Sequence, residues 1–174
     1  GTFLKTASEV GTKGTPIIGV NMGRLGFLAN VLPGDICNVL GDVISSRLEI
    51  DERSVMMLCL DNKPVDFNPY ALNDIAILKR DTASMISIRA SLNGEFLVTY
   101  LADGLVVSTP SGSTAYSLSN GGPILIPQTG TFSLTPVAPH SLNIRPIVMS
   151  EDVEIRLAVE SRSHNFLVAI DGRF

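Results

Sequence analysis

The sequence from residue 86 to residue 101 is ISIRASLNGEFLVTYL. Apolar and polar residues alternate on both sides of Asn93-Gly94, a dipeptide that readily adopts the left-handed backbone of a two-residue hairpin turn. A period of two residues is typical of strands with one buried face. The stretch therefore predicts a β-hairpin, and we infer the fold outward from it.

The same period continues over most of the chain after about residue 47. Short alternating runs, separated by Gly, Pro, Asn and Ser, occur at 54–60, 71–78, 104–109, 131–137, 151–160 and 166–170. In the run 151–160 we expect four side chains to face inward: Val153, Ile155, Leu157 and Val159. Many short strands at this spacing favour layered sheets, as in a sandwich, over a doubly wound fold.

The N-terminal part of the chain has a different pattern. Residues 2–10 and 33–46 carry apolar side chains at helical spacing, and Pro33 suits a first helical turn. The run 16–20 (PIIGV) is typical of a buried parallel strand, and a glycine-bearing turn at 21–26 follows it. These elements predict one fragment of an α/β domain and a linking helix.

We therefore expect two parts and an α+β, mostly β fold class. Residues 1–46 would be the C-terminal part of an α/β, Rossmann-like domain, and residues 47–174 would be a β-rich, sandwich-like domain. One internal helix is expected at 113–120, where Gly121-Gly122-Pro123 would end it. A chain that begins at Gly1 without Met, directly in an apolar segment, is expected to be part of something longer.

Composition excludes several classes of protein. Of 174 residues, 45% are hydrophobic and 17% are charged, and the mean hydropathy of +0.30 argues against disorder. No apolar run approaches the roughly 18 residues that span a bilayer, and no leader peptide is evident. The net charge of -4, without a basic run, disfavours nucleic acid. Cys37 and Cys59 form no C-x-x-C pair, so we expect buried free thiols in a reducing cytoplasm.

The segment 103–123, DGLVVSTPSGSTAYSLSNGGP, is the richest in candidate chemistry. It predicts a buried strand, a tight turn at 110–113 and a helix from Thr114, which would aim backbone N–H groups and hydroxyls at a phosphate or another polar ligand. Alternatively, the Ser and Thr side chains only cap the helix. The Tyr116 ring could cover a flat heterocycle, or it could lie in the core with its hydroxyl in water.

The pair Asn73-Asp74 lies within an apolar, β-branched strand, ALNDIAIL at 71–78. Burying an amide and a carboxylate there costs about 1–3 kcal/mol each unless both find partners. The vicinal hydroxyls of a ribose would be suitable partners for the carboxylate. A neighbouring turn could provide the hydrogen bonds instead.

Other motifs are weak or absent. The stretch 21–28 (NMGRLGFL) follows a strand-like run but lacks the spacing G-x-G-x-x-G, and no Walker loop occurs. Ser111 or Ser113 could be imagined in a hydrolase triad with His140 and Asp103. The sequence lacks the G-x-S-x-G elbow typical of such hydrolases, so a serine hydrolase is disfavoured. His140 and His164 lack a ligand cluster, so a metal centre built on them is disfavoured.

Four segments, in this order, resemble the bacterial NAD kinases that use ATP or polyphosphate. They are GVNMGRLGFL at 19–28, LNDIAI at 72–77, DGLVVSTPSGSTAYSLSNGGPI at 103–124 and PHSLNIRPIV at 139–148. The resemblance covers most of the chain, and the third segment is long and specific. It implies an N-terminal α/β domain with a G-G-D-G motif, followed by a β-rich NAD-binding domain.

The resemblance also implies an activity and partners. Such kinases transfer a phosphoryl group from ATP or polyphosphate to the 2′-hydroxyl of the adenosine ribose of NAD, giving NADP, with a divalent metal, Mg²⁺ in the first instance. Gly1 would be the last glycine of the motif, so the catalytic aspartate would directly precede it. No catalytic residue is then expected in these 174 residues, and this chain alone would be inactive. A cytoplasmic homo-oligomer, dimer or tetramer, with no nucleic-acid or membrane partner, is implied.

Site residues follow by position from the same resemblance. Asn73 and Asp74 would hold the adenosine ribose. Four residues would line the adenine side: Phe27, Thr114, Ala115 and Ser119. Ser111, Ser117 and Leu118 belong to the same loop and helix, and Gly1 to the substrate site. Asp103 and Tyr116 would contact the nicotinamide half of a ligand shared with a neighbouring subunit. Ala138 and Ser84 are weaker candidates for the site as a whole.

Two positions depart from some relatives: Leu101 replaces an arginine and Arg173 replaces a glutamine. Two further functions stay open at this point, a noncatalytic dinucleotide-binding or regulatory module and a related lipid kinase.

Overall fold

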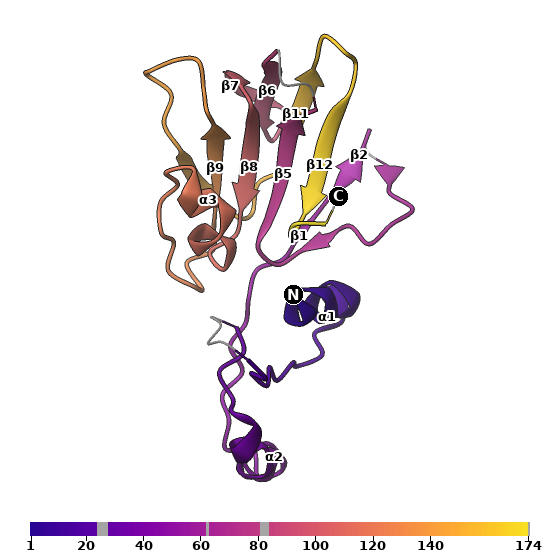
Figure 1. Ribbon diagram of the computed structural model, residues 1–174, viewed down its shortest axis with the longest axis vertical. Coiled ribbons are helices and arrows are strands. Elements are labelled where there is room, and N and C mark those ends of the chain that lie inside the picture. The colour runs from indigo at the N-terminus through magenta and orange to yellow at the C-terminus, as the bar shows by residue number, and fades with distance from the viewer. Residues whose placement is uncertain (24–27, 62, 81–83, 174) are drawn as a thin grey trace. The chain divides into compact units, whose positions relative to one another are not determined.

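The computed structural model describes every residue except 24–27, 62, 81–83 and 174. The chain divides into two units, Gly1–Glu52 and Arg53–Phe174, which are coloured indigo to violet and violet to yellow in Figure 1. The boundary that the sequence places after residue 46 stays a prediction.

The first unit is helical in its described part. Helix α1 spans Thr2–Val10, a 3-10 turn follows at Gly11–Lys13, and a second 3-10 turn at Pro33–Asp35 leads into α2, Ile36–Ile44. Both predicted helices are confirmed. The strand predicted at 16–20 is wrong: only Val20 pairs there, in an isolated parallel bridge to Val31. A buried parallel strand needs neighbouring strands, and the described residues of this unit form none.

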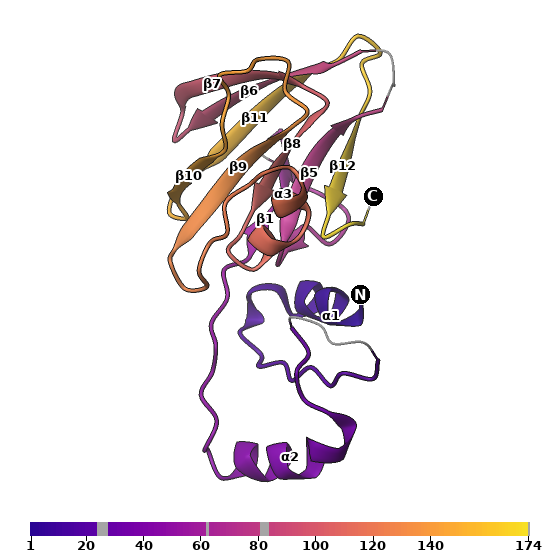
Figure 2. The same cartoon turned by 60° about the vertical axis from the view of Figure 1, so that its left-hand side comes forward.

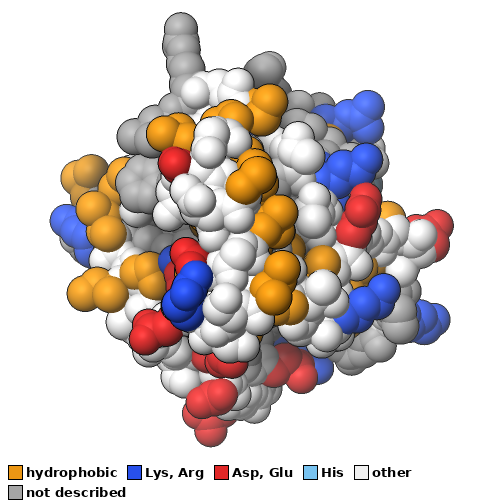
Figure 3. Space-filling model, turned by 90° about the horizontal axis from the view of Figure 1, so that it is seen from below, with side chains coloured by type: hydrophobic (Ala, Val, Ile, Leu, Met, Phe, Trp, Pro, Cys, Tyr) orange, Lys and Arg blue, Asp and Glu red, His pale blue; other side chains and the backbone are white. Residues whose placement is uncertain are grey.

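Helix α2 has no buried residue. Its apolar side chains Leu40, Val43 and Ile44 are exposed, and hydrophobic side chains reach the surface in the view from below (Figure 3). The prediction of buried thiols is also wrong, because Cys37, on this helix, and Cys59 are both exposed. No helix among the described residues is long and apolar enough to cross a bilayer.

The second unit is built on two antiparallel sheets (Figures 1 and 2). The larger sheet has the strand order β10-β9-β8-β5-β12. Its strands are β5 (Asp74–Lys79), β8 (Gly104–Ser108), β9 (Thr131–Val137), β10 (Ile147–Ser150) and β12 (Phe166–Ile170). The smaller sheet, in the order β11-β6-β7, has β11 (Ile155–Glu160), β6 (Ile86–Leu92) and β7 (Glu95–Ala102).

Two short ribbons precede the large sheet. Strand β1 (Met56–Met57) pairs with β4 (Tyr70–Ala71), and β2 (Cys59–Leu60) pairs with β3 (Lys63–Pro64). The run predicted at 54–60 is thus divided between two ribbons.

The predicted hairpin is β6–β7. Asn93 and Gly94 have φ values of 49° and 86°, which a two-residue turn with the right-handed twist of its strands requires. One register irregularity lies between Ala90 and Ser91. The prediction is confirmed.

The core lies between the two sheets. Large-sheet side chains such as Ile75, Leu105 and Leu134 pack in one cluster with Ile88 and Tyr100 of the smaller sheet. The four inward side chains expected in 151–160 are partly buried against this cluster. Mostly β architecture in layered sheets is therefore confirmed.

The internal helix expected at 113–120 is present, but it is shorter than expected and divided in two. A 3-10 turn, Gly112–Thr114, and one α-helical turn, α3 (Tyr116–Ser119), are interrupted at Ala115, whose φ and ψ are -101° and -123°. The Ser113 hydroxyl donates to the Pro110 carbonyl (2.7 Å) and accepts from the Leu125 amide (3.0 Å). Neither turn has a side-chain cap. The segment is held by loop contacts, and the site for a polar ligand expected at its start stays a prediction.

Candidate nucleotide site

The two segments singled out by the sequence, Asn73-Asp74 and 110–119, meet at one end of the central strands of the large sheet. Strands β5 and β8 are antiparallel, and Asp74, which begins β5, pairs with Ser108, which ends β8. The loop before β5 and the loop after β8 therefore leave the sheet together. We call this end of the two strands the site end. The opposite end, where β5 ends at Lys79 and β8 begins at Gly104, is the far end.

Backbone contacts join these loops directly. The Thr109 amide donates to the Asn73 carbonyl (3.0 Å), and the Thr109 hydroxyl donates to the Leu72 carbonyl (2.5 Å) and accepts from the Gly112 amide (3.1 Å). A Cβ atom at Gly112 would lie 1.9 Å from the Asn73 carbonyl oxygen. Only glycine allows this approach. The turn at 110–113 and the Asn73-Asp74 pair thus form one rigid arrangement.

Two polar groups are buried at this junction, the Oδ1 atom of Asn73 and the side chain of Asp74. Asn73 Oδ1 has no hydrogen-bond partner among the described residues, and Asp74 is only 6% exposed. Burial, and secondly the negative charge of Asp171, raise the pKa of Asp74 from 3.8 to about 6. A buried acceptor without a donor costs free energy. A ligand that offers hydroxyl or amine hydrogens to both groups would remove this cost.

Asp171 directly follows β12 and lies at the site end. The sequence did not predict its part in the site. Its carboxylate accepts from the amides of Leu72 (3.0 Å), Asn73 (2.8 Å) and Asp74 (3.1 Å). The signal was the dipeptide Asp171-Gly172, which is typical of a tight hairpin turn. Sequence alone did not indicate which backbone the carboxylate would reach.

The segment 111–119 has exposed and buried members. Tyr116 is 38% exposed and Leu118 is 42% exposed, so the Tyr116 ring is not part of the core. Thr114 and Ala115 are half-buried, and Ser119 is exposed. These residues remain candidates for a nucleotide surface.

Two serines of the same segment have protein partners. Ser117 is fully buried, and its hydroxyl lies 2.9 Å from that of Thr135 on β9. Ser111 accepts a hydrogen bond from the Arg53 guanidinium (3.4 Å). The hydrogen bond between Ser117 and Thr135 fixes the segment to the sheet. A contact of Ser117 with a ligand stays a prediction, which the burial of Ser117 does not favour.

The remaining candidates lie at the far end. Asp103 precedes β8 and forms an ion pair with Lys79 (2.7 Å), Ala138 follows β9 and Ser84 precedes β6. Strand β5 has six residues, and at about 3.4 Å per residue the two ends are roughly 17 Å apart. Within one chain, the structure therefore does not bring Asp103 together with Asn73 and Asp74, or with Tyr116.

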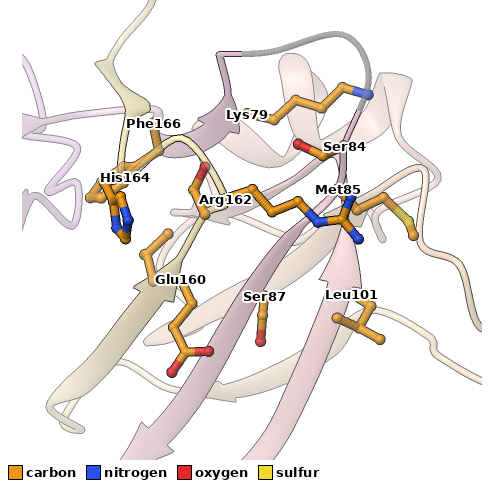
Figure 4. Close-up of a pocket in the computed structure, with 11 residues that line it drawn as sticks. Lys79, Ser84, Met85, Ser87, Leu101, Glu160, Arg162, His164 and Phe166 are labelled. Atoms are coloured by element: carbon orange, nitrogen blue, oxygen red, sulfur yellow. The ribbon is translucent and has the colours of Figure 1, made fainter.

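A cavity of about 830 Å³ opens at the far end. Its lining includes Lys79, Ser84, Leu101, Glu160, Arg162 and Phe166. Arg162 extends across the cavity toward Met85 (Figure 4). The cavity is a separate feature from the site end.

Three expectations fall outside this geometry. Phe27 lies outside the described residues, and Gly1 is exposed at the start of α1 in the first unit. Among the described residues, no group of three or more His, Cys, Asp or Glu side chains could hold a metal. Because the side chains present do not make a metal site by themselves, we assign no step to a metal held by this chain.

Comparison with protein families shows to which family the chain belongs. The family model described as the ATP-NAD kinase C-terminal domain matches residues 72–174, and the model of the ATP-NAD kinase N-terminal domain matches residues 1–48. The chain belongs to the ATP-NAD kinase family. The resemblance expected from the sequence motifs is confirmed.

Curated NAD kinases match nearly the whole chain. The protein of Bacteroides fragilis is 61% identical over 172 residues, and that of Porphyromonas gingivalis is 51% identical over 173 residues; each match covers 99% of this chain and 59% of the relative. The chain thus spans about three fifths of the length of these NAD kinases. The noncatalytic-module and lipid-kinase alternatives are not favoured.

Solved kinase structures share the fold. Yeast NADH kinase complexed with NADH superposes with a TM-score of 0.86 at 32% identity, covering 98% of this chain and 50% of that one. The NAD kinase from Archaeoglobus fulgidus in complex with ATP gives 0.75 at 30% identity, covering 91% and 60%.

Proposed function

We propose that the complete protein to which this chain belongs is an NAD kinase. It would transfer the terminal phosphoryl group of ATP, or of polyphosphate, to the 2′-hydroxyl of the adenosine ribose of NAD, giving NADP. The family assignment and the NAD kinases of Bacteroides fragilis and Porphyromonas gingivalis support this activity. The catalytic carboxylate is expected directly before Gly1, outside this chain.

The observation that carries the proposal is the junction of Asn73-Asp74 with the turn at Gly112. The unpaired Asn73 Oδ1 would accept a hydrogen bond from adenosine. Asp74, with its pKa of about 6, is mostly ionised at neutral pH, and vicinal ribose hydroxyls would donate charge-assisted hydrogen bonds to it. Binding would then satisfy groups that are costly to leave buried.

The neighbouring segment 114–119 would contact the two heterocycles of NAD. The ring of Tyr116, being partly exposed, can lie against the nicotinamide ring of a ligand shared with a neighbouring subunit. Stacking of bases on aromatic side chains is worth about 1–3 kcal/mol. Thr114, Ala115, Leu118 and Ser119 would complete the adenine side. Oriented in this way, the ribose presents its 2′-hydroxyl for transfer.

A neighbouring copy would complete the site. Asp103, Ser84 and Ala138 lie at the far end, about one strand length from Asn73, so contacts to the nicotinamide half from these residues would come from a second subunit. We therefore propose a homo-oligomer. We also propose that it is cytoplasmic, as the resemblance to bacterial NAD kinases implies. A divalent cation, Mg²⁺ in the first instance, would accompany the phosphoryl donor and neutralise charge on its oxygens.

The activity is tested with the complete protein, ATP or polyphosphate, Mg²⁺ and NAD. NADP formation is followed with an NADP-specific dehydrogenase. We expect NADP from at least one donor, and equal turnover by Asp152→Asn, a change in the exposed turn between β10 and β11. Absence of NADP with both donors would refute the proposal.

The shared site is tested by complementation. Asp74→Ala and Asp103→Ala each remove one contribution to the site. If two subunits build each site, exchanging subunits between the two variants recreates intact sites, and activity returns to up to about a quarter of the wild-type value. If each chain builds its own site, the mixture stays as inactive as its components.

A further inference from the structure

A tight turn closes the end of β12. Asp171 and Gly172 have φ values of 49° and 73°, and Ile170 and Arg173 exchange backbone hydrogen bonds of 2.8 and 2.9 Å across the turn. A left-handed backbone is uncommon for residues other than glycine, although Asp tolerates it better than most. The turn directs the Asp171 carboxylate back toward β5.

Three backbone amides converge on that carboxylate. Leu72 donates to Oδ2, and Asn73 and Asp74 both donate to Oδ1. The Asp171 amide returns a hydrogen bond to the Asp74 carbonyl (2.9 Å). Leu72 and Asn73 precede β5 and take no part in its ladder. Asp171 therefore provides the acceptor for amides that the sheet leaves unsatisfied.

The same short segment is also held from its other side. The carbonyls of Leu72 and Asn73 accept from Thr109. With amides fixed by Asp171 and carbonyls fixed by Thr109, the backbone at 72–74 has little freedom. The directions of the Asn73 and Asp74 side chains follow from that backbone.

We propose that Asp171 is a positioning residue of the adenosine site, which fixes the backbone of Leu72–Asp74 so that the Asn73 and Asp74 side chains meet the ribose. This inference rests on the proposed function. Asp171 would not touch the ligand itself. It would act through hydrogen bonds to the segment that does.

The arrangement has an electrostatic cost that a purely structural turn would avoid. Asp171 places a second carboxylate close to Asp74, and its charge contributes to the raised pKa of that group. An uncharged acceptor could serve one or two amides without this repulsion. A carboxylate accepts from all three amides at once through charge-assisted hydrogen bonds. We take this as a sign that Asp171 is selected for precise placement of the Leu72–Asp74 backbone and not for the stability of the fold.

The test compares Asp171→Asn with Asp171→Ala in the complete protein. Asparagine keeps one acceptor oxygen for Asn73 and Asp74 but turns an N–H₂ group toward the Leu72 amide, and alanine removes all three bonds. We expect the KM for NAD to rise about tenfold in Asp171→Asn and further in Asp171→Ala, while the KM for ATP changes less than twofold. Asp152→Asn, a matched change in another turn, should leave both constants unchanged.

Two further measurements make the outcome decisive. Amide hydrogen exchange at 72–74 should accelerate in Asp171→Asn, and calorimetry measures NAD affinity on folded protein if Asp171→Ala is unstable. A lower melting temperature with an unchanged KM for NAD in Asp171→Asn would overturn the positioning role alone. A wild-type protein that makes no NADP overturns the proposed function instead, so the two failures are distinguishable.

Discussion

The two ends of the large sheet differ in how deeply their polar side chains are buried. At the site end, Gly112 lies against the Asn73 carbonyl with no room for a side chain, and Asp74 is buried. At the far end, Lys79 and Asp103 form a partly exposed ion pair beside a cavity of about 830 Å³. Strands β5 and β8 connect both ends. One pair of strands thus connects a closely packed end, where the candidate nucleotide site lies, with an end that opens into a cavity.

The largest expected effect is at Gly112. Gly112→Ala places a Cβ atom 1.9 Å from the Asn73 carbonyl oxygen, so the backbone must move. We expect a loss of about 3 kcal/mol or more in the free energy of unfolding, measured by urea denaturation, and no detectable NAD binding.

Gly41→Ala is the control for this change. Nothing lies within 4 Å of the added methyl group, and the position is inside helix α2, so a gain of about 0.5–1 kcal/mol is expected. Equal behaviour of the two variants would show that the site end is no more constrained than a surface helix.

Asp74→Asn separates stability from binding. The folded-state pKa of about 6 lies above the ordinary 3.8, so the folded protein retains a proton that the unfolded chain has lost, and stability falls as pH rises from about 4 to 6. The variant should be about 1–3 kcal/mol more stable than wild type at pH 8 and equal to it at pH 3. NAD affinity should fall at least tenfold. A variant less stable at pH 8 would contradict the electrostatic reasoning.

Tyr116→Ala tests the exposed part of the site end. We expect a loss of around 1–2 kcal/mol in NAD binding by calorimetry, because the ring is 38% exposed and only one face can lie on a base. Tyr116→Phe keeps the ring and should bind like wild type. Unchanged affinity in the alanine variant would remove the ring from the binding surface.

Lys79→Met should have the smallest effect. Partly exposed ion pairs typically contribute about 0–1 kcal/mol, so thermal melting should change by little, and less in high salt. A loss comparable to that of Gly112→Ala would mean that the far end is as tightly built as the site end.

Local patterns in the sequence predicted much of the fold. Asn93-Gly94 identified the hairpin because its backbone requirement is set by two adjacent residues. Helices α1 and α2 followed from apolar spacing. The run 16–20 was misread because the strands that would flank it are absent from the described part of that unit.

The candidate site was predicted less completely, because long-range contacts decide it. The interruption at Ala115 accompanies the bonds of Ser113 to a loop twelve residues further along. Asp171 reaches amides almost one hundred residues away, a pairing that no local pattern contains. Asp103 and Ser111 are close in sequence but lie at opposite ends because strand β8 separates them.

The position of Asp171, one residue beyond the last strand, bears on how this protein can be shortened. A fragment that ends at Ile170 would keep every strand and every side chain assigned to the nucleotide. It would lose the carboxylate that anchors Leu72–Asp74. If Asp171 has the proposed positioning role, we expect such a fragment to fold as a complete sandwich with weakened NAD binding. These hydrogen bonds therefore extend the β-rich unit past the end of β12, its last described strand.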